Sequence, residues 1–283
     1  TMEKFIDLHT HSTMSDGSMS PAELVRHAKE AGLAAIALTD HDSVAGVEEA
    51  MAEGERLGIE VVPGIELSAK SATETHVLGY YIDKNNPALA AALEDILKER
   101  INRTHRTCQK LNELGFDVTV EEAEALAPAG VVGRAHFAKL MVLKGYVSSV
   151  KEGFELYFNN GRPAYSSRQK IDRFQAIDLI KNAGGLAFIA HLHLTRMEDD
   201  ELEVFLTELR DYGLDGIEGY YTDYSPQMQE KYQALAKKLG LMISGGTDFH
   251  AQMKPHISIG KGLGDLKIPY SVLAAMKERL GIN

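Results

Sequence analysis

Short apolar runs alternate with longer helical patterns along most of this chain, and the alternation limits the folds open to it. Seven runs have the length and composition of strands: 4–8, 34–39, 60–65, 77–82, 186–190, 216–220 and 241–244. Helical patterns fall near 21–31, 44–57, 172–183, 199–212, 226–239 and 269–279. Strands that alternate with helices predict a parallel sheet or an α/β barrel, here one strand short of the common eight-stranded form.

One long segment departs from this alternation. Between the fourth and fifth strand-like runs, about 75 residues have a helical pattern and no convincing strand. Helices are expected near 87–114, 120–126, 134–144 and 149–158. We therefore predict a barrel domain formed by 1–86 and 163–283, with 87–162 inserted as a small helical subdomain.

Charge and composition exclude some classes of partner. The chain has 283 residues and a net charge of −11 with histidine neutral. Because polyanions bind basic surfaces, this balance argues against a long nucleic-acid interface but leaves a small phosphorylated substrate open. No apolar run approaches the ~20 residues of a membrane-spanning helix, so no membrane partner is expected. The single cysteine, Cys108, can form no internal disulfide, and a cytoplasmic location fits.

The first strand-like run continues into Asp7-Leu8-His9-Thr10-His11. Strand side chains alternate between faces, so Asp7, His9 and His11 are expected to point the same way. Two imidazoles two residues apart at the end of a strand can chelate one metal ion. The pair alone is weak evidence, because a solvated turn is the more common explanation for it.

Metal-ligand side chains recur where other runs end. They are His41 after the second run, Glu66 after the third, His191 after the fifth, and Asp248 with His250 after the seventh. The carboxyl ends of strands form the active face of α/β barrels and open sheets. Packing alone does not explain runs that stop repeatedly at these residue types, although separate polar loop residues are the simple alternative.

His76 needs a separate argument because it precedes its run, at the wrong pole for a parallel strand. The stretches 60–68 and 75–82 are joined by a short polar segment. If they form a hairpin with its turn near Ser71, Glu66 falls opposite His76, with Cβ atoms about 4.5–5.5 Å apart. This geometry predicts one antiparallel pair in the barrel.

Together these positions supply six imidazoles and three carboxylates: His9, His11, Asp16, His41, Glu66, His76, His191, Asp248 and His250. That set exceeds what one zinc site needs and implies two or three divalent metal ions. Mixed nitrogen and oxygen ligands suit Mn²⁺, Zn²⁺ or Fe²⁺, and the sequence does not choose among them. Without a cation, three converging carboxylates would repel one another.

These motifs resemble those of the PHP (polymerase and histidinol phosphatase) superfamily. The matching segments are IDLHTHSTMSDGSMSP, ALTDHDSVAGVEEA, GIELS, IAH and GGTDFH. The middle stretch VGRAHFAKLMVLKGYVSSVKEGFELYFNNGRPAY is similar to the helical insertion of one branch. That branch contains nucleotide phosphatases of the AMP and 3′,5′-nucleoside bisphosphate types, and a related exoribonuclease.

The resemblance implies an α/β fold, a distorted (β/α)7 barrel with a helical insertion, and a trinuclear metal centre. Its ligand sets, carried onto this chain, are His9, His11, Glu66 and Asp248 for one ion, Glu66, His76 and His191 for a second, and Asp16, His41 and His250 for a third. The resemblance also implies attack of a metal-bound hydroxide on phosphorus, with Asp248 required for turnover.

The same resemblance implies how the substrate phosphate is held. Arg134 and Arg162 match basic insertion positions that contact phosphate in the branch, and guanidinium groups suit two-point phosphate binding. Otherwise each is a solvated helix or turn residue. His136 is expected to contact the substrate or the edge of the metal site, or to be a satisfied histidine between domains.

The segment His191-Leu192-His193 departs from many relatives, which have proline after the metal-binding histidine. His193 is expected to contact the substrate, to act as an acid near the leaving group, or to contact the metal ligands without binding the metal itself. The neighbouring carboxylates that are not assigned as ligands are expected to orient imidazoles. They are Asp7, Asp40 and Asp42.

Several functions are open at this point. The leading one is a metal-dependent phosphatase that hydrolyses a phosphomonoester of a small nucleotide. The alternatives are a 5′–3′ exoribonuclease or oligonucleotide hydrolase, a histidinol-phosphate phosphatase, and a metal-binding scaffold without activity. The acidic balance disfavours a long nucleic-acid tract, the insertion favours the nucleotide branch, and the complete ligand set disfavours a scaffold. The oligomeric state is left open.

Overall fold

The structure, a computed structural model, describes residues 2–127 and 132–283. It divides into two compact units, Thr1–Ala91 with Lys170–Asn283, and Ala92–Gln169. The second unit differs by a few residues at each end from the insertion predicted at 87–162. The difference at the first boundary has a simple cause, since helix α3 (Pro87–Glu113) runs through it without a break.

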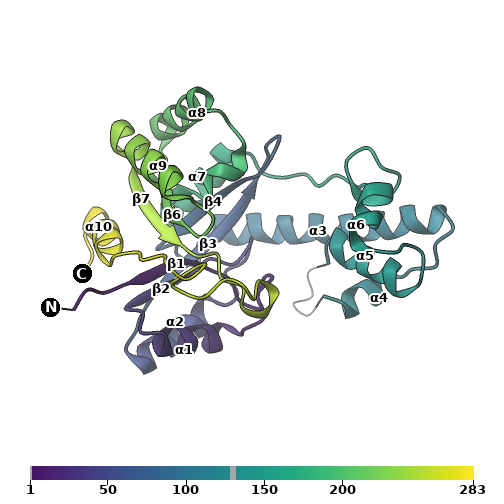
Figure 1. Cartoon of the computed structure of the whole chain (residues 1–283), viewed down its shortest axis with the longest axis horizontal. Helices are drawn as coiled ribbons and strands as arrows, with labels where there is room; N and C mark the ends of the chain where they lie inside the picture. Colours follow the sequence, from purple (N-terminus) through teal and green to yellow (C-terminus); the bar gives the residue numbers. More distant parts are fainter. Residues whose placement is uncertain (1, 128–131) are drawn as a thin grey trace. The chain divides into compact units, whose positions relative to one another are not determined.

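The first unit contains one seven-stranded sheet whose strands are hydrogen-bonded in chain order (Figure 1). The strands are β1 Ile6–Thr10, β2 Ala35–Leu38, β3 Glu60–Ala69, β4 Thr75–Tyr80, β5 Leu186–Ile189, β6 Gly216–Tyr221 and β7 Met242–Gly246. The first strand also meets the segment after the last, because Asp248 N donates to His9 O and His11 N donates to Phe249 O, both at 2.9 Å. The sheet is a nearly closed barrel, which confirms the predicted α/β fold.

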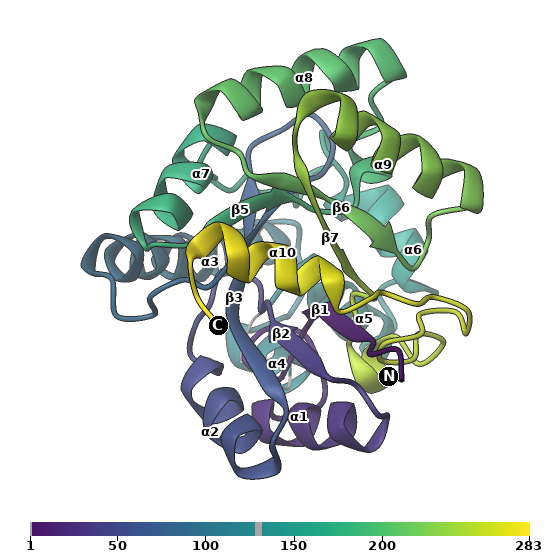
Figure 2. The same cartoon turned by 90° about the vertical axis from the view of Figure 1, so that its left-hand side faces the viewer.

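Helices cover the barrel and close one of its ends. They are α1 Pro21–Glu30, α2 Val47–Leu57, α7 Arg173–Asn182, α8 Asp199–Tyr212, α9 Pro226–Leu239 and α10 Ser271–Leu280. Figure 2 shows α10 crossing the end of the barrel, where Leu273 and Met276 join one buried cluster with Ile6, Leu8 and Phe188. Helix α10 thereby covers the apolar end of the barrel. The buried polar side chains lie toward the opposite ends of the strands.

The β3–β4 hairpin corrects one detail of the sequence prediction. The antiparallel pair is present, but Ser68 lies opposite His76, and Glu66 lies opposite Leu78. The turn is centred one residue later than expected, so the register shifts by two residues. A shift of two keeps every side chain on its face. Glu66 therefore reaches His76 diagonally across the hairpin, with Oε1 2.8 Å from Nδ1.

The seam between β1 and β7 depends on a glycine and a buried aspartate. A Cβ atom on Gly246 would lie 2.2 Å from the Cβ of His9, so only glycine allows this approach. Asp7 is fully buried and accepts hydrogen bonds from the amides of Thr247 (3.0 Å) and Gly260 (2.8 Å). The register of β1 also shifts after Asp7. Asp7 therefore binds the backbone of the seam.

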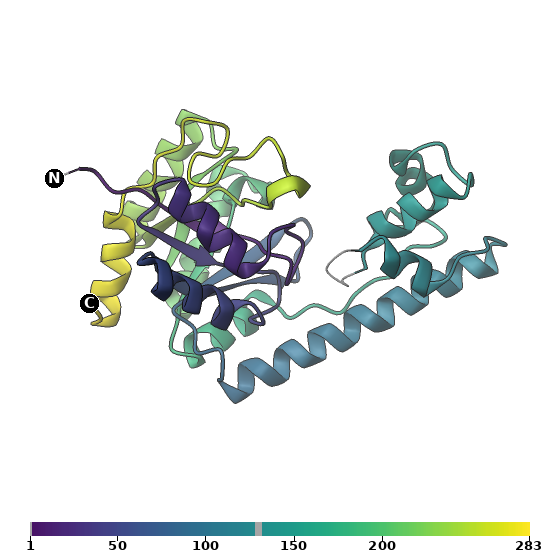
Figure 3. The ribbon, with the colours of Figure 1, turned by 90° about the horizontal axis from the view of Figure 1, so that it is seen from below.

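The second unit is helical. Besides the later part of α3, it contains α4 Val120–Ala125, α5 Arg134–Leu143, α6 Val150–Gly153 and a π-helical turn at Phe154–Phe158. Figure 3 shows its shorter helices beside α3, and Leu111 of α3 shares a buried cluster with Phe137 and Phe158. Within the described residues, no helix has the length and apolar character needed to cross a membrane.

Candidate metal centre

The centre of the site is the carboxylate of Glu66, which is buried where β3 passes the ends of its neighbours. Its Oε2 atom lies 3.1 Å from Nε2 of His9, 3.1 Å from Nε2 of His11 and 3.2 Å from Nδ1 of His41. Its Oε1 atom lies 2.8 Å from Nδ1 of His76 and 3.2 Å from Nε2 of His191. One carboxylate therefore touches five imidazoles.

Asp248 and Asp16 extend this arrangement on either side. Asp248 Oδ1 lies 3.3 Å from Nε2 of His9 and 3.0 Å from Nε2 of His11. Asp16 Oδ1 lies 2.9 Å from Nε2 of His250, and Asp16 Oδ2 lies 3.5 Å from Nε2 of His41. The side chain of Asp16 is 53% exposed, so this end of the cluster reaches solvent. All nine residues predicted as ligands thus lie in one connected cluster.

The ligand atoms fall into groups of the size that a metal ion needs. Within each group the ligand atoms lie within 4.8 Å of one another. The four groups are His9, His11, Glu66 and Asp248; His11, Asp16, His41 and His250; His41, Glu66 and His76; and Glu74, His76 and His191. The first coincides with a predicted ligand set, and the second contains another. The last adds Glu74, whose Oε1 is 3.6 Å from Nε2 of His76 and which the sequence analysis did not single out.

Two buried nitrogens show that the cluster fits a cation. Nε2 of His11 and Nε2 of His250 each lie close to carboxylate oxygens, yet neither forms a hydrogen bond to any described residue. The distances are 3.0 Å from Nε2 of His11 to Oδ1 of Asp248 and 2.9 Å from Nε2 of His250 to Oδ1 of Asp16, but the geometry is not that of a hydrogen bond. Nitrogen and oxygen donors that converge in this way are what a transition-metal ion requires.

The electrostatics of the cluster also favour added positive charge. Burial alone would raise the pKa of Glu66, but His9, His41 and His76 hold it well below its usual range. Burial would lower the pKa of His11, but Asp248 and Glu66 raise it to about 10. The same carboxylates, with Glu218, raise the pKa of His9 against burial. The carboxylates therefore stay ionised and require cations, which protons on histidine or bound metal ions can supply.

The backbone is strained at two of these residues. His191 has φ 26° and Asp248 has φ 60°, a region that side-chain-bearing residues rarely adopt. The amide of Asp248 is held by His9 O, and that of His191 by the carboxylate of Glu218 at 2.7 Å. Backbone strain of this kind persists where surrounding hydrogen bonds fix the conformation. Here the strained conformation directs the side chains of His191 and Asp248 toward the cluster.

Glu218 is the main residue that the sequence analysis missed. It is fully buried on β6, its Oε2 lies 2.7 Å from Nδ1 of His9, and its Oε1 accepts the amide hydrogen of His191. It orients one ligand side chain and fixes the backbone of another. The available signal was a single carboxylate in the otherwise uncharged run 216–220.

Two carboxylates expected to orient imidazoles have a different role. Asp40 accepts hydrogen bonds from Ser12 N, Ser12 Oγ and Ser15 Oγ, each at 2.7 Å, and so shapes the loop after β1. The carboxylate of Asp7 binds backbone amides at the β1–β7 seam, as described above. Among the described residues, neither carboxylate bonds directly to an imidazole, and Asp40 reaches His11 only through Ser15, whose Oγ lies 3.4 Å from Nδ1 of His11.

The residues predicted to contact substrate are divided between the units. His193 lies in the 3₁₀ turn Leu192–Thr195 of the barrel unit, with its ring 5.5 Å from those of Tyr221 and Tyr224. Burial and nearby His191 lower the pKa of His193. Tyr224 is buried, and its hydroxyl donates to Glu218 O.

The other predicted contacts belong to the helical unit. Arg134 begins α5, donates to Phe158 O at 3.1 Å and stacks over the rings of Phe154 and Tyr165. Arg162 is exposed on a turn. Nδ1 of His136 accepts the amide hydrogen of Gly133, so this histidine at least caps α5.

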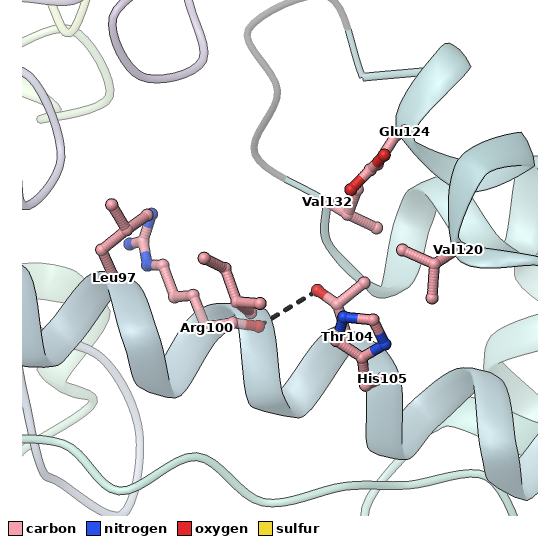
Figure 4. Close-up of a pocket in the computed structure, with 8 residues that line it drawn as sticks. Leu97, Arg100, Thr104, His105, Val120, Glu124 and Val132 are labelled. Carbon is pink, nitrogen blue, oxygen red and sulfur yellow. Dashed lines mark hydrogen bonds between the residues drawn. The ribbon is translucent and has the colours of Figure 1, made fainter.

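A separate small hollow of about 50 Å³ lies within the helical unit between α3 and α4 (Figure 4). Its lining includes the apolar side chains of Leu97, Ile101, Val120 and Val132, and Thr104 there donates to Arg100 O within α3. Neither Arg134 nor Arg162 lines it. The hollow therefore does not correspond to the predicted phosphate site.

Comparison with known proteins decides the family. The model of the PHP domain matches residues 7–257. This chain belongs to the PHP domain family. The match contains all nine clustered residues, from His9 to His250.

The PHP relatives have more than one activity. The chain is 35% identical over 263 residues to a protein of Haemophilus influenzae named 5′-3′ exoribonuclease, covering 93% of this chain and 95% of the relative. It is 35% identical over 248 residues to the 3′,5′-nucleoside bisphosphate phosphatase of Chromobacterium violaceum, covering 87% of each. A proposed metal-dependent phosphoesterase of Bifidobacterium adolescentis superposes with a TM-score of 0.79 at 26% identity, covering 98% of this chain and 96% of that one. The chain thus belongs among the metal-dependent phosphoesterases.

Replacing Glu218 with glutamine tests its orienting role. The two bonds go to different oxygens of Glu218, and glutamine replaces one of these oxygens with an NH₂ donor, so it cannot accept at both positions. We expect Glu218→Gln to weaken Mn²⁺ binding about 10–100-fold, as measured by competition with a chromophoric chelator. Glu203→Gln, which removes a surface ion pair to Lys238, is the matched control. Equal affinities for Glu218→Gln and wild type would show that Glu218 does not position the ligands.

Proposed function

We propose that this PHP protein is a metal-dependent phosphatase that hydrolyses a phosphomonoester of a small nucleotide, of the AMP or 3′,5′-bisphosphate type. The observation that carries the proposal is the buried Glu66 carboxylate shared by five imidazoles and flanked by Asp16 and Asp248. The similarity to a nucleoside bisphosphate phosphatase over most of the chain supports the substrate class.

In this proposal the clustered residues hold two or three divalent ions, of manganese, zinc or iron. The ligand sets are His9, His11, Glu66 and Asp248; Glu66, His76 and His191; and Asp16, His41 and His250. Such ions, when bound, lower the pKa of water and stabilise the attacking and leaving oxygens of phosphoryl transfer. The protein itself contributes fixed ligand directions through Glu218 and the strained backbone at His191 and Asp248.

The remaining predicted residues are proposed to handle the substrate. His193, beside the cluster, contacts the departing group and, in its protonated form, donates its proton to the leaving oxygen. Arg134 and Arg162 bind phosphate oxygens, and His136 contacts the substrate beside them. One nitrogen of the Arg134 guanidinium donates to Phe158 O, and stacking on aromatic rings leaves its other N–H groups available for a phosphate.

The first test is a panel of phosphoesters with metal-loaded protein. We expect release of inorganic phosphate from AMP or adenosine 3′,5′-bisphosphate with Mn²⁺ present, and less from histidinol phosphate. Asp248→Asn should reduce the rate to background, because it removes negative charge from a ligand of the first set. Protein that binds metal but hydrolyses no member of the panel would refute a phosphoesterase function.

A second candidate is a 5′–3′ exoribonuclease, favoured by the similarity to the Haemophilus influenzae protein. A short 5′-phosphorylated oligoribonucleotide belongs in the same panel. Stepwise release of mononucleotides without phosphate release from AMP would select this candidate. The net charge of −11 predicts that activity falls as the oligonucleotide lengthens.

Arg134→Ala should raise the KM for the nucleotide about 10–100-fold, since a charge-assisted bond to phosphate contributes roughly 1.5–3 kcal/mol. We expect kcat to change little, and steady-state kinetics separate the two. Lys151→Ala is the control, because this cation of the helical unit is 85% exposed. An unchanged KM would assign Arg134 to packing on Phe154 and Tyr165.

His193→Asn tests proton delivery to the leaving group. A positioned acid contributes about 10²–10⁴-fold when the leaving group is a poor one. We therefore expect a large loss of kcat with AMP and little loss with 4-nitrophenyl phosphate, whose leaving group needs no proton. His105→Asn, at an exposed position of α3, is the control. Equal losses with both substrates would make His193 a contact residue and not the acid.

A further inference from the structure

The two oxygens of Asp248 have different surroundings. Oδ1 faces the imidazoles, 3.0 Å from Nε2 of His11 and 3.3 Å from Nε2 of His9. Oδ2 faces away and is bonded twice, to the hydroxyl of Tyr221 at 2.8 Å and to Nζ of Lys254 at 2.9 Å. Both are hydrogen bonds to an ionised carboxylate and therefore stronger than neutral ones.

Both partners of Oδ2 are fixed by their own surroundings. The ring of Tyr221 is buried at the end of β6, and its centre lies 6.1 Å from that of His9 and 5.6 Å from that of His191. Lys254 follows the 3₁₀ turn Ala251–Met253, with its amide bonded to Ala251 O and its side chain 37% exposed. One donor is a rigid buried phenol and the other an ammonium at the surface of the site.

This arrangement limits how Asp248 can bind a cation. A carboxylate that binds through both oxygens must bring both to the ion, and here Oδ2 would have to release the phenol and the ammonium. Breaking these bonds leaves a buried phenol and a half-buried charge without their partner, which is costly. Oδ1 alone is free to bind.

We propose that Tyr221 and Lys254 form a clamp that holds Asp248 as a single-oxygen ligand, and that the clamp selects transition-metal ions against Ca²⁺. The proposal rests on the metal-dependent function proposed above. Tyr221 and Lys254 are positioning residues in it, because they act on the metal through Asp248.

The chemistry of the ions explains the direction of selection. Ca²⁺ takes about 6–8 oxygen ligands in flexible geometry and readily uses both oxygens of a carboxylate. Manganese, iron and zinc accept imidazole nitrogens and fewer ligands. A nitrogen-rich cluster already disfavours Ca²⁺, and a clamped aspartate withholds one more oxygen from it.

The test compares Mn²⁺ and Ca²⁺ affinities in the variant Tyr221→Phe/Lys254→Met. Dissociation constants are measured by competition with a chromophoric chelator on protein first stripped of metal. We expect Mn²⁺ to bind about 10-fold more weakly, as is typical when a residue that orients a ligand is lost. Ca²⁺ should bind as well as before or better, so the preference for Mn²⁺ falls by about the same factor. Each single variant should give an intermediate preference, and Lys254→Arg, which keeps the charge, should retain the wild-type preference.

Two surface pairs provide matched controls. Tyr212→Phe removes a phenol bond to Asp178 (2.6 Å), and Lys231→Met removes an ammonium bond to Asp199 (2.8 Å). Neither pair touches the cluster, so the Mn²⁺ to Ca²⁺ preference should stay at the wild-type value in the double control variant.

The possible results separate the two proposals. If wild-type protein binds no divalent ion, both fail. If it binds Mn²⁺ and the Tyr221→Phe/Lys254→Met variant keeps the wild-type preference, or loses affinity for both ions equally, the clamp alone is refuted. If the double variant does not fold, Tyr221→Phe decides, because it keeps the ring packing and removes only one donor. An unchanged preference in Tyr221→Phe would then refute the clamp.

Discussion

The structure depends on the buried carboxylate of Glu66, whose ionised form is stabilised by the imidazoles around it. Glu66 is removed from solvent, and an isolated ionised carboxylate in such a place would be very unfavourable. Five imidazoles from the ends of four other strands surround it. Each of these strands must therefore end at the level of Glu66 along the barrel axis. The nearly closed sheet and the candidate metal centre therefore require the same strand positions.

The barrel meets that requirement through unusual backbone at its seam. Gly246 permits the contact with His9, and the buried carboxylate of Asp7 satisfies the amides of Thr247 and Gly260 where regular pairing ends. Beyond the seam, Asp248 adopts a left-handed conformation that a ladder of regular strands could not supply. The strained conformation at this position directs the Asp248 carboxylate away from the barrel wall and toward the cluster.

Around the cluster, three groups decide how the ligands can act. Glu218 fixes His9 and the backbone of His191, while Tyr221 and Lys254 occupy one oxygen of Asp248. These residues bind no ion in our proposal, yet they determine which atoms face it. Phosphoester hydrolysis by such a centre depends on that fixed geometry, because the ions must hold water and phosphate in a defined relation.

The sequence by itself determined the order of strands and helices and the residues of the cluster, since apolar runs ending in His, Asp or Glu are visible without coordinates. Periodicity also placed Glu66 and His76 in one hairpin, and the two-residue error in register did not separate them because strand faces repeat every two residues. Only the tertiary structure showed that Asp7 binds amides at the β1–β7 seam, and that Glu218, Tyr221 and Lys254 contact the cluster. Those outcomes depend on a register shift in β1 and on contacts between segments far apart in the chain, which local spacing does not encode.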